Sequence, residues 1–140
     1  MTARRGSRPA RTLARRARAI RLLVLDVDGV LTDGRLHYGP HGEEVKVFHV
    51  QDGLALVGAQ RAGLQLAVLS GRASPAVSRR MADLGIGEVH QDVANKLQFL
   101  RGGLIRRLSV TPAQVAYMGD DLSDLPRLPP WVWPWLPPGV

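Results

Sequence analysis

Residues 22–34 read LLVLDVDGVLTDG, and the fold that we expect follows from this stretch. Its first four residues are aliphatic, which is typical of a strand buried on both faces of a parallel sheet. The run delivers two carboxylates, Asp26 and Asp28, followed by Gly29. A buried charge costs roughly several kcal/mol unless it is paired or bound to a metal, so the two acids indicate a functional site. The alternative is a surface Asp-x-Asp-Gly turn, because Asp and Gly are common in turns.

Aliphatic runs alternate with helical patterns along the rest of the chain, and this alternation predicts an α/β fold with a parallel sheet. We expect a Rossmann-like, three-layer arrangement with a β-hairpin after the first strand, formed by residues 35–38 and 44–48 around the turn 39–42. Asp52 is a candidate N-cap for the first helix of the body. The other expected strands are 64–69, 88–90 and 115–118, and the expected helices are 52–61, 74–84, 95–108 and a helical turn at 111–112.

The chain's basic character is confined to its beginning. The net charge of the 140 residues is +7, but eight arginines and no acid fall within the first 21 residues. The remainder carries 19 − 8 = 11 basic residues against 12 acidic ones. Such an arm can bind nucleic acid or anionic lipid, or serve in targeting. It has neither an aromatic residue nor an apolar segment, so we favour a solvated arm with a short helix at 12–20, and neither a nucleic-acid nor a membrane partner.

Polar residues follow three of the expected strands. They are Asp26 and Asp28 after the first, Ser70, Gly71 and Arg72 after the second, and Asp120, Asp121 and Asp124 after the last, while Lys96 begins a helix. The carboxyl ends of parallel strands share one edge of a sheet, where ligands bind. Carboxylates in a chain with 0 Cys suit Mg²⁺. A serine, backbone amides and an ammonium suit a phosphoryl group. The set indicates phosphoryl transfer with a carboxylate nucleophile and a carboxylic general acid.

These motifs resemble the haloacid dehalogenase superfamily. The resemblance is closer still to its capless subfamily of 3-deoxy-D-manno-octulosonate (KDO) 8-phosphate phosphatases. It covers residues 20–126 and is carried by DVDGVLTDG at 26–34, GEEVKVF at 42–48, QDG at 51–53, SGR at 70–72, Lys96 and AYMGDD at 116–121. Residues 1–19 then form an arm, residues 20–126 the phosphatase domain, and residues 127–140 a separate tail.

The resemblance implies a role for each matching residue. Asp26 is the expected nucleophile and Asp28 the general acid and base, and both are expected to bind Mg²⁺ together with Asp120, supported by Asp121 and Asp124. Expected contacts to the phosphate or the sugar acid come from Ser70, Gly71, Arg72, Arg80, Lys96 and the stretch His49, Val50, Gln51, Asp52 and Gly53. Plainer alternatives are a solvated Arg80, a structural His49 and an Asp124 that only caps a helix. The resemblance also implies a cytoplasmic homotetramer whose hairpins cover neighbouring sites, acting in lipopolysaccharide biosynthesis.

The sequence departs from the family at three places. Gln51 stands where the family has Arg, and Asp92 stands where it has Gly. After Pro126 the family continues through a helix and a strand, whereas residues 127–140 read RLPPWVWPWLPPGV, which forms neither. Codons for residues 130–136, read from their third base, give apolar-Gly-apolar-Ala-apolar-Ala, the pattern of the missing strand. We therefore hypothesise a frameshift, with a genuine Trp/Pro-rich interaction tail as the alternative.

Three functions from different classes remain open on the sequence alone. The first is a Mg²⁺-dependent phosphatase acting on KDO 8-phosphate or on a nine-carbon relative such as an acylneuraminate or KDN 9-phosphate. The second is an inactive, frameshifted homologue. The third is a nucleic-acid or membrane binder that works through the arm.

Overall fold

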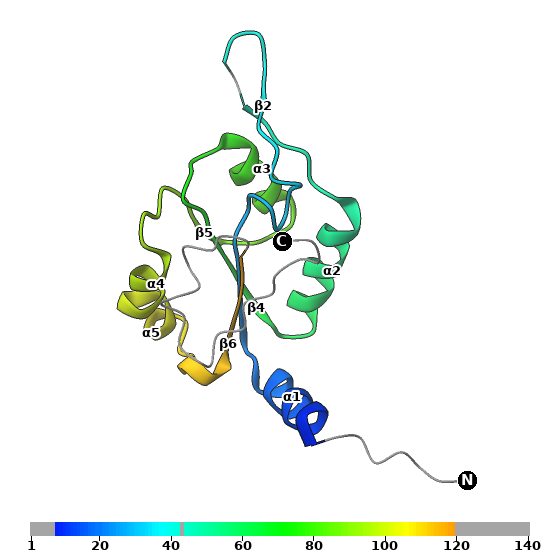
Figure 1. The fold of residues 1–140 in the computed structure, drawn as a ribbon, viewed down its shortest axis with the longest axis vertical. Helices are drawn as coiled ribbons and strands as arrows, with labels where there is room; N and C mark the ends of the chain where they lie inside the picture. Colours follow the sequence, from blue (N-terminus) through cyan, green and yellow to red (C-terminus); the bar gives the residue numbers. More distant parts are fainter. Residues whose placement is uncertain (1–7, 43, 120–140) are drawn as a thin grey trace, which may run out of the picture.

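The computed structural model describes residues 8–42 and 44–119 and has helices on both faces of a parallel sheet (Figure 1). The strand order is β5-β4-β1-β6, and each neighbouring pair is parallel. The strands are β1 (Leu22–Leu25), β4 (Gln65–Leu69), β5 (Glu88–His90) and β6 (Val115–Met118). The prediction of a Rossmann-like parallel sheet is therefore confirmed, and the structure adds that β1 is an inner strand between β4 and β6.

The remaining elements follow the expected order along the chain. The helices are α1 (Arg8–Ala19), α2 (Val50–Arg61), α3 (Pro75–Asp83), α4 (Lys96–Phe99), the π-helical η1 (Leu100–Leu104), α5 (Ile105–Arg107) and the 3₁₀ turn η2 (Pro112–Gln114). A separate antiparallel pair, β2 (His37–Tyr38) and β3 (Glu44–Val45), forms the hairpin. In Figure 1 this hairpin projects from one end of the body and α1 from the other.

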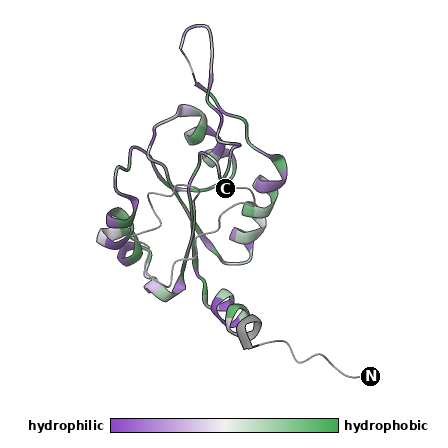
Figure 2. Ribbon diagram, viewed as in Figure 1, coloured by the Kyte–Doolittle hydropathy of each residue, from purple (hydrophilic) through white to green (hydrophobic). Residues whose placement is uncertain are grey.

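Alternate residues of β1 feed two separate hydrophobic cores. Leu22 and Val24 pack with the residues of the α4–η1–α5 segment, including Leu100 and Leu104. The second core contains Leu25 and Val27 and receives side chains from α2 and α3. Figure 2 shows hydrophobic residues along the central strands. This period of two explains why β1 is aliphatic throughout: neither of its faces meets water.

The order of the strands reverses beside β1. The chain first moves outward from β1 to β4 and β5 by way of α2 and α3, which share one core. It then returns past β1 to β6 through helices that belong to the other core. Ligands of open α/β sheets bind at the carboxyl ends of the two strands beside such a reversal. Here those strands are β1 and β6, so the topology points to their carboxyl ends as the ligand site.

The structure corrects several predicted boundaries. Helix α2 begins at Val50 with His49 as its N-cap, because the His49 Nδ1 accepts a hydrogen bond from the Gln51 amide at 3.2 Å, so Asp52 is a first-turn residue and not the cap. Helix α1 begins at Arg8, earlier than predicted. The hairpin is present, but only two residues of each arm are paired. The predicted helix 95–108 contains the π-helical turn η1.

None of the helices in the described ranges is long and apolar enough to cross a membrane. The tail at 127–140, on which the frameshift hypothesis rests, lies outside the described residues.

Candidate active site

Asp26 is a buried carboxylate that contacts a backbone amide and a lysine ammonium. It directly follows β1, and its amide donates to the Met118 carbonyl at 2.9 Å, which extends the ladder between β1 and β6 by one residue. Its side chain is only 8% exposed. The Val27 amide donates to Oδ1 at 2.7 Å, and the Lys96 Nζ lies 2.6 Å from Oδ2. The predicted meeting of Asp26 and Lys96, 70 residues apart in sequence, is thus present.

Lys96 reaches Asp26 because of a local capping interaction. Asn95 is the N-cap of α4, and its Oδ1 accepts a hydrogen bond from the Gln98 amide at 2.9 Å. This cap starts the helix at Lys96 and directs its side chain to the carboxyl edge of the sheet. The Lys96 side chain is 13% exposed, so the ion pair with Asp26 is shielded from solvent.

Asp28 lies in the tight turn after β1. The Leu31 amide donates to the Val27 carbonyl at 2.8 Å, and Gly29 has φ +81°, a conformation that glycine adopts without steric cost. The Lys46 Nζ lies 2.6 Å from the Asp28 Oδ1. Sequence reasoning placed Lys46 within a family motif but gave it no role. The contact was missed because it joins the turn to a hairpin 18 residues away.

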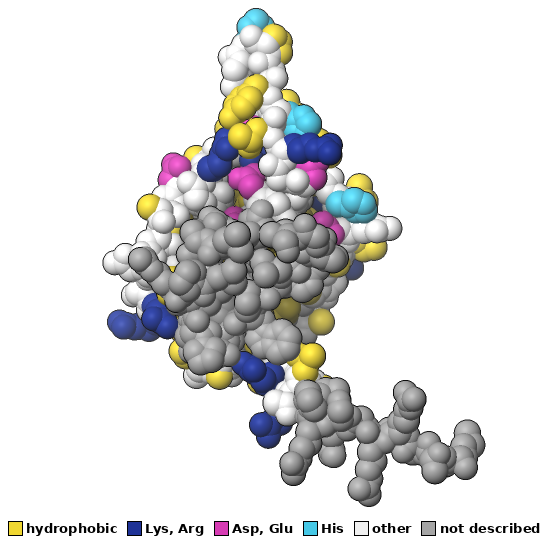
Figure 3. All heavy atoms as spheres, viewed as in Figure 1, with side chains coloured by type: hydrophobic (Ala, Val, Ile, Leu, Met, Phe, Trp, Pro, Cys, Tyr) yellow, Lys and Arg dark blue, Asp and Glu magenta, His cyan; other side chains and the backbone are white. Residues whose placement is uncertain are grey.

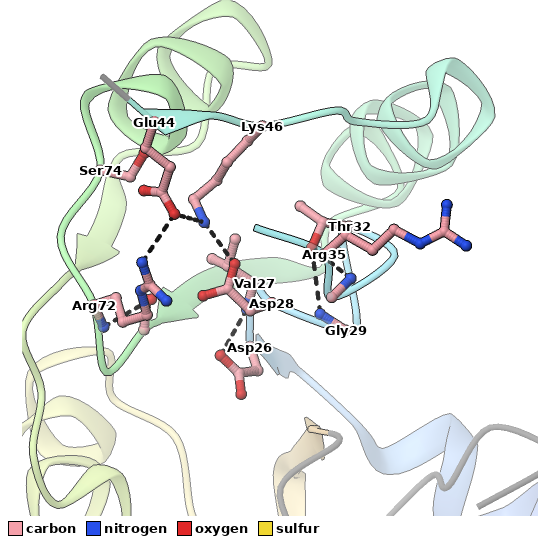
Figure 4. Close-up of polar contacts among 12 residues, drawn as sticks. Asp26, Val27, Asp28, Gly29, Thr32, Arg35, Glu44, Lys46, Arg72 and Ser74 are labelled. Carbon is pink, nitrogen blue, oxygen red and sulfur yellow. Dashed lines mark hydrogen bonds and ion pairs between the residues drawn. The ribbon is translucent and has the colours of Figure 1, made fainter. Parts of the chain in front are cut away.

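A second missed residue, Glu44, links the hairpin to the loop after β4. Its Oε1 accepts hydrogen bonds from Lys46 at 3.1 Å and from the Arg72 Nη2 at 3.1 Å. Arg72 also donates to the Tyr38 Oη at 3.4 Å. Figure 4 shows Glu44 and Lys46 pointing from the hairpin toward Arg72 and Asp28. The site is therefore bordered by an alternating chain of charges, Asp28–Lys46–Glu44–Arg72.

These contacts raise the pKa of Lys46 and the pKa of Arg72. Burial lowers the pKa of Lys46, but its hydrogen bonds to Asp28 and Glu44 outweigh burial, so the pKa lies above its ordinary value. The hydrogen bond to Tyr38 and the charge of Glu44 raise the pKa of Arg72. Lys46 and Arg72 therefore both carry a positive charge at neutral pH, beside the carboxylates of Asp28 and Glu44.

Ser70 and Gly71 form a turn on the same edge of the sheet. Ser70 is 2% exposed, and its Oγ accepts a hydrogen bond from the Arg72 amide at 3.2 Å. The Ser70 amide donates to the His90 carbonyl and its own carbonyl accepts from Val93, so both strand ends fix this turn. Among residues 8–42 and 44–119, the Val93 carbonyl, at 3.9 Å, is the neighbour that a Cβ on Gly71 would meet.

The predicted contacts at His49–Gly53 and Arg80 form a separate group around the start of α2. The Arg80 Nη2 donates to the His49 carbonyl at 3.3 Å, and the guanidinium lies 5.9 Å from the centre of the Phe48 ring. Arg80 also covers Gly53, which is buried. Arg80 thus supports the helix start in this structure. A contact of Arg80 with substrate stays a prediction.

A pocket of about 480 Å³ lies between this helix start and the turn after β1. It is lined by Val30, Leu31, Thr32, Asp33, Val47, Phe48, His49, Gln51 and Asp52. Three of the predicted contacts, His49, Gln51 and Asp52, therefore share one cavity. Val50 is 80% exposed and Gly53 lies beneath Arg80, so neither is among its lining residues.

The predicted metal site is only partly within the described residues. Asp120, Asp121 and Asp124 lie outside them. In residues 8–42 and 44–119 there is no group of three or more His, Cys, Asp or Glu side chains that could hold a metal ion. Two of the predicted donors, the Asp26 carboxylate and the backbone carbonyl of Asp28, belong to the described residues, and both are hard oxygens just after β1. This donor chemistry fits Mg²⁺.

Asp92, which stands where the family has glycine, adopts a backbone conformation that is typical of glycine. Asp92 has φ +56°, in the left-handed region that glycine favours and that Asp tolerates better than most residues. The backbone can therefore keep the conformation that suits the family's glycine. The neighbouring turn at Ser70 remains hydrogen-bonded to Val93.

Comparison with known proteins gives close relatives. No protein-family model matches the chain. It is 47% identical over 112 residues to the KDO 8-phosphate phosphatase of Haemophilus influenzae, which covers 76% of this chain and 59% of that protein. Among solved structures, the KDO 8-phosphate phosphatase of Moraxella catarrhalis, in complex with magnesium, phosphate and KDO, has a TM-score of 0.78 and 42% identity over 82% of this chain and 66% of that one. A putative haloacid dehalogenase superfamily hydrolase of Legionella pneumophila has a TM-score of 0.79 and 40% identity over 84% and 64%.

The chain thus spans less than two thirds of the length of these three relatives. Both the sequence and the fold nevertheless match through most of the described residues. The chain belongs to the haloacid dehalogenase superfamily, as a homologue of its KDO 8-phosphate phosphatases.

Proposed function

We propose that this protein is a Mg²⁺-dependent phosphatase that hydrolyses KDO 8-phosphate to KDO and inorganic phosphate through an aspartyl-phosphate. The observation that carries the proposal is the buried Asp26 carboxylate, oriented by the Val27 amide and the Lys96 ammonium, beside a second carboxylate on Asp28. The named function of relatives that are 42–47% identical supports the choice of substrate.

In the first step, an oxygen of Asp26 attacks phosphorus and the bond from phosphorus to the sugar oxygen breaks. Asp28 donates its proton to that oxygen, which leaves as an alcohol. Ser70 and the Gly71 amide bind the phosphoryl oxygens, and Lys96 offsets their charge. Arg72 is suited to the carboxylate of a sugar acid, because its guanidinium already binds one carboxylate, that of Glu44.

In the second step, Asp28 acts as a carboxylate and takes a proton from water, whose oxygen attacks phosphorus. The acyl-phosphate bond breaks, phosphate leaves, and Asp26 is restored. Asp26, the Asp28 carbonyl and Asp120 would hold Mg²⁺, the ion bound in the Moraxella catarrhalis relative. When bound, Mg²⁺ supplies positive charge that stabilises the phosphoryl oxygens.

Release of phosphate from KDO 8-phosphate, with Mg²⁺ or with EDTA, tests the proposal. We expect turnover that needs Mg²⁺ and falls by about 10³-fold or more in Asp26→Asn, because that amide is not a nucleophile. KDN 9-phosphate is assayed in parallel, and a higher kcat/KM on it reassigns the substrate. A folded wild-type chain without turnover on either compound contradicts the proposal and favours the inactive homologue.

We also propose that the protein assembles as a homotetramer and acts in the cytoplasm, supplying KDO for lipopolysaccharide. Support for assembly comes from six exposed apolar side chains, which we call the hairpin patch. The hairpin patch consists of Leu36, Tyr38, Val45, Val47, Val50 and Leu54, each 46% or more exposed. Hydrophobic side chains are visible along the projecting hairpin in Figure 3. A patch of this kind is typical of a protein interface.

A further inference from the structure

The chain contains few lysines, and they contact the Asp26 and Asp28 carboxylates of the proposed site. Of its 19 basic residues, only Lys46 and Lys96 are lysines; the other 17 are arginines. Lys96 contacts Asp26 and Lys46 contacts Asp28, each at 2.6 Å. Lysine differs from arginine in presenting a compact point charge rather than a planar fork. Each of the two lysines therefore contacts one of the two carboxylates to which the proposed mechanism assigns a role.

The Lys46 ammonium is held more firmly than a surface ion pair. Its side chain is 3% exposed, and it binds Asp28 and Glu44 at the same time. Glu44, whose side chain is 13% exposed, is fixed in turn by Arg72. Asp28 itself is 27% exposed and lies in a turn, where its carboxylate could otherwise rotate. Three charged groups thus determine where one oxygen of Asp28 lies.

We propose that Lys46 is a positioning residue, which binds Oδ1 of Asp28 so that Oδ2 carries the proton delivered to the leaving sugar oxygen. This inference rests on the proposed function. In the step concerned, the O–H bond at Asp28 Oδ2 breaks and a new O–H bond forms on the sugar alcohol. Lys46 keeps its protons throughout and acts only through the orientation of Asp28.

The alternative is that Lys46 merely ties the hairpin to the body. The two roles differ in how they depend on the leaving group. A sugar alkoxide is a poor leaving group and needs the proton from Asp28, whereas p-nitrophenolate leaves without one. The ratio kcat/KM reports only the steps up to departure of the leaving group, so hydrolysis of the aspartyl-phosphate does not enter the comparison.

The experiment measures kcat/KM for KDO 8-phosphate and for p-nitrophenyl phosphate in wild type, Lys46→Met and Lys46→Arg. We expect Lys46→Met to lose about 10-fold or more on the sugar phosphate beyond its loss on the aryl phosphate. Lys46→Arg, which keeps the charge, recovers part of this difference. In an Asp28→Asn background, Lys46→Met has no further effect on the sugar phosphate, because the group that it positions is gone.

Arg79→Met is the matched control. It removes the charge from a solvent-exposed partner of Asp83 on α3 and leaves both activities unchanged. Equal losses of Lys46→Met on both substrates would overturn the positioning role, as would an undiminished effect in the Asp28→Asn background. If the wild type hydrolyses neither substrate, the proposed function fails and the role of Lys46 with it. Wild-type activity with equal losses refutes the inference alone.

Discussion

Gly53 shows how a single residue allows Arg80 to pack onto the start of α2. A Cβ at position 53 would collide with the Arg80 Nη2 and lie 3.1 Å from the Leu84 Cδ2. Gly58, on the same helix, is exposed, and a Cβ there would meet no atom of the described part of the chain within 4 Å. The two glycines therefore share an element and differ only in what surrounds them.

We predict that Gly58→Ala raises the free energy of unfolding by about 0.5–1 kcal/mol, because alanine has the higher helix propensity. Gly53→Ala gains no such stability, since it displaces Arg80 from the His49 carbonyl and the Phe48 ring. Urea unfolding monitored by circular dichroism measures both variants. In an Arg80→Ala background the Gly53→Ala variant recovers at least about 0.5 kcal/mol. Equal effects at the two glycines would contradict this explanation.

At the residue scale, the sequence was informative where chemistry is encoded locally. Asp26, Asp28, Ser70 and Lys96 each follow a strand or begin a helix, so a parallel topology predicts that they share one edge. The Lys96–Asp26 contact confirms this for that pair. Lys46 and Glu44 escaped notice because a charged residue on a hairpin resembles ordinary solvated surface. Only the fold reveals that Lys46 is 3% exposed.

At the scale of the element, two helices begin with different kinds of N-cap. Asn95 caps α4 with a side-chain hydrogen bond to the Gln98 amide. Ser74 occupies the same position on α3 but makes no capping hydrogen bond, and its buried Oγ has no partner among the residues that the structure describes. Pro75 and the hydrogen bond from the Ser74 amide to the Gln91 Oε1 fix this helix start instead.

We predict that Asn95→Ala lowers the free energy of unfolding by about 1 kcal/mol, the usual cost of losing an N-cap. Ser74→Ala does not lower it and raises it by up to about 1 kcal/mol, because a buried hydroxyl without a partner pays a desolvation cost that the methyl group avoids. Chemical denaturation of the two variants at the same pH provides the comparison. A loss at Ser74 as large as that at Asn95 would mean that the Ser74 hydroxyl is bonded in solution.

Element types were predictable and element boundaries less so. The four strands of the main sheet were expected from aliphatic runs, and each lies within one residue of its predicted limits. The first helix of the body was misplaced by two residues because His49, an uncommon N-cap, precedes the more typical Asp52. The π-helical turn in the 95–108 segment has no pattern in sequence that we could have used.

At the scale of the whole molecule, the topology brings segments that are far apart in sequence to one edge of the sheet. The strand order reverses beside β1, and there Asp26 is hydrogen-bonded to Met118 at the end of β6. Helices from both cores approach this edge, and the hairpin adds Lys46 and Glu44 from a third direction. The sequence did not predict the contacts of Lys46 and Glu44, because these contacts join segments that are far apart along the chain.

Assembly is the remaining property of the whole molecule, and the hairpin patch is where we expect it. Val47 and Leu54 are 61% and 75% exposed, and both belong to this patch. We predict that the wild type has a mass in solution of about four times 15.3 kDa. Val47→Glu combined with Leu54→Glu reduces it toward 15.3 kDa, because carboxylates cannot be buried unpaired in an apolar interface. Light scattering during size-exclusion chromatography measures the mass of both proteins.

Leu13→Glu, on α1 and 43% exposed, is the control that keeps the assembly intact. A monomeric wild type would refute the tetramer, and an intact double variant would move the interface away from the hairpin.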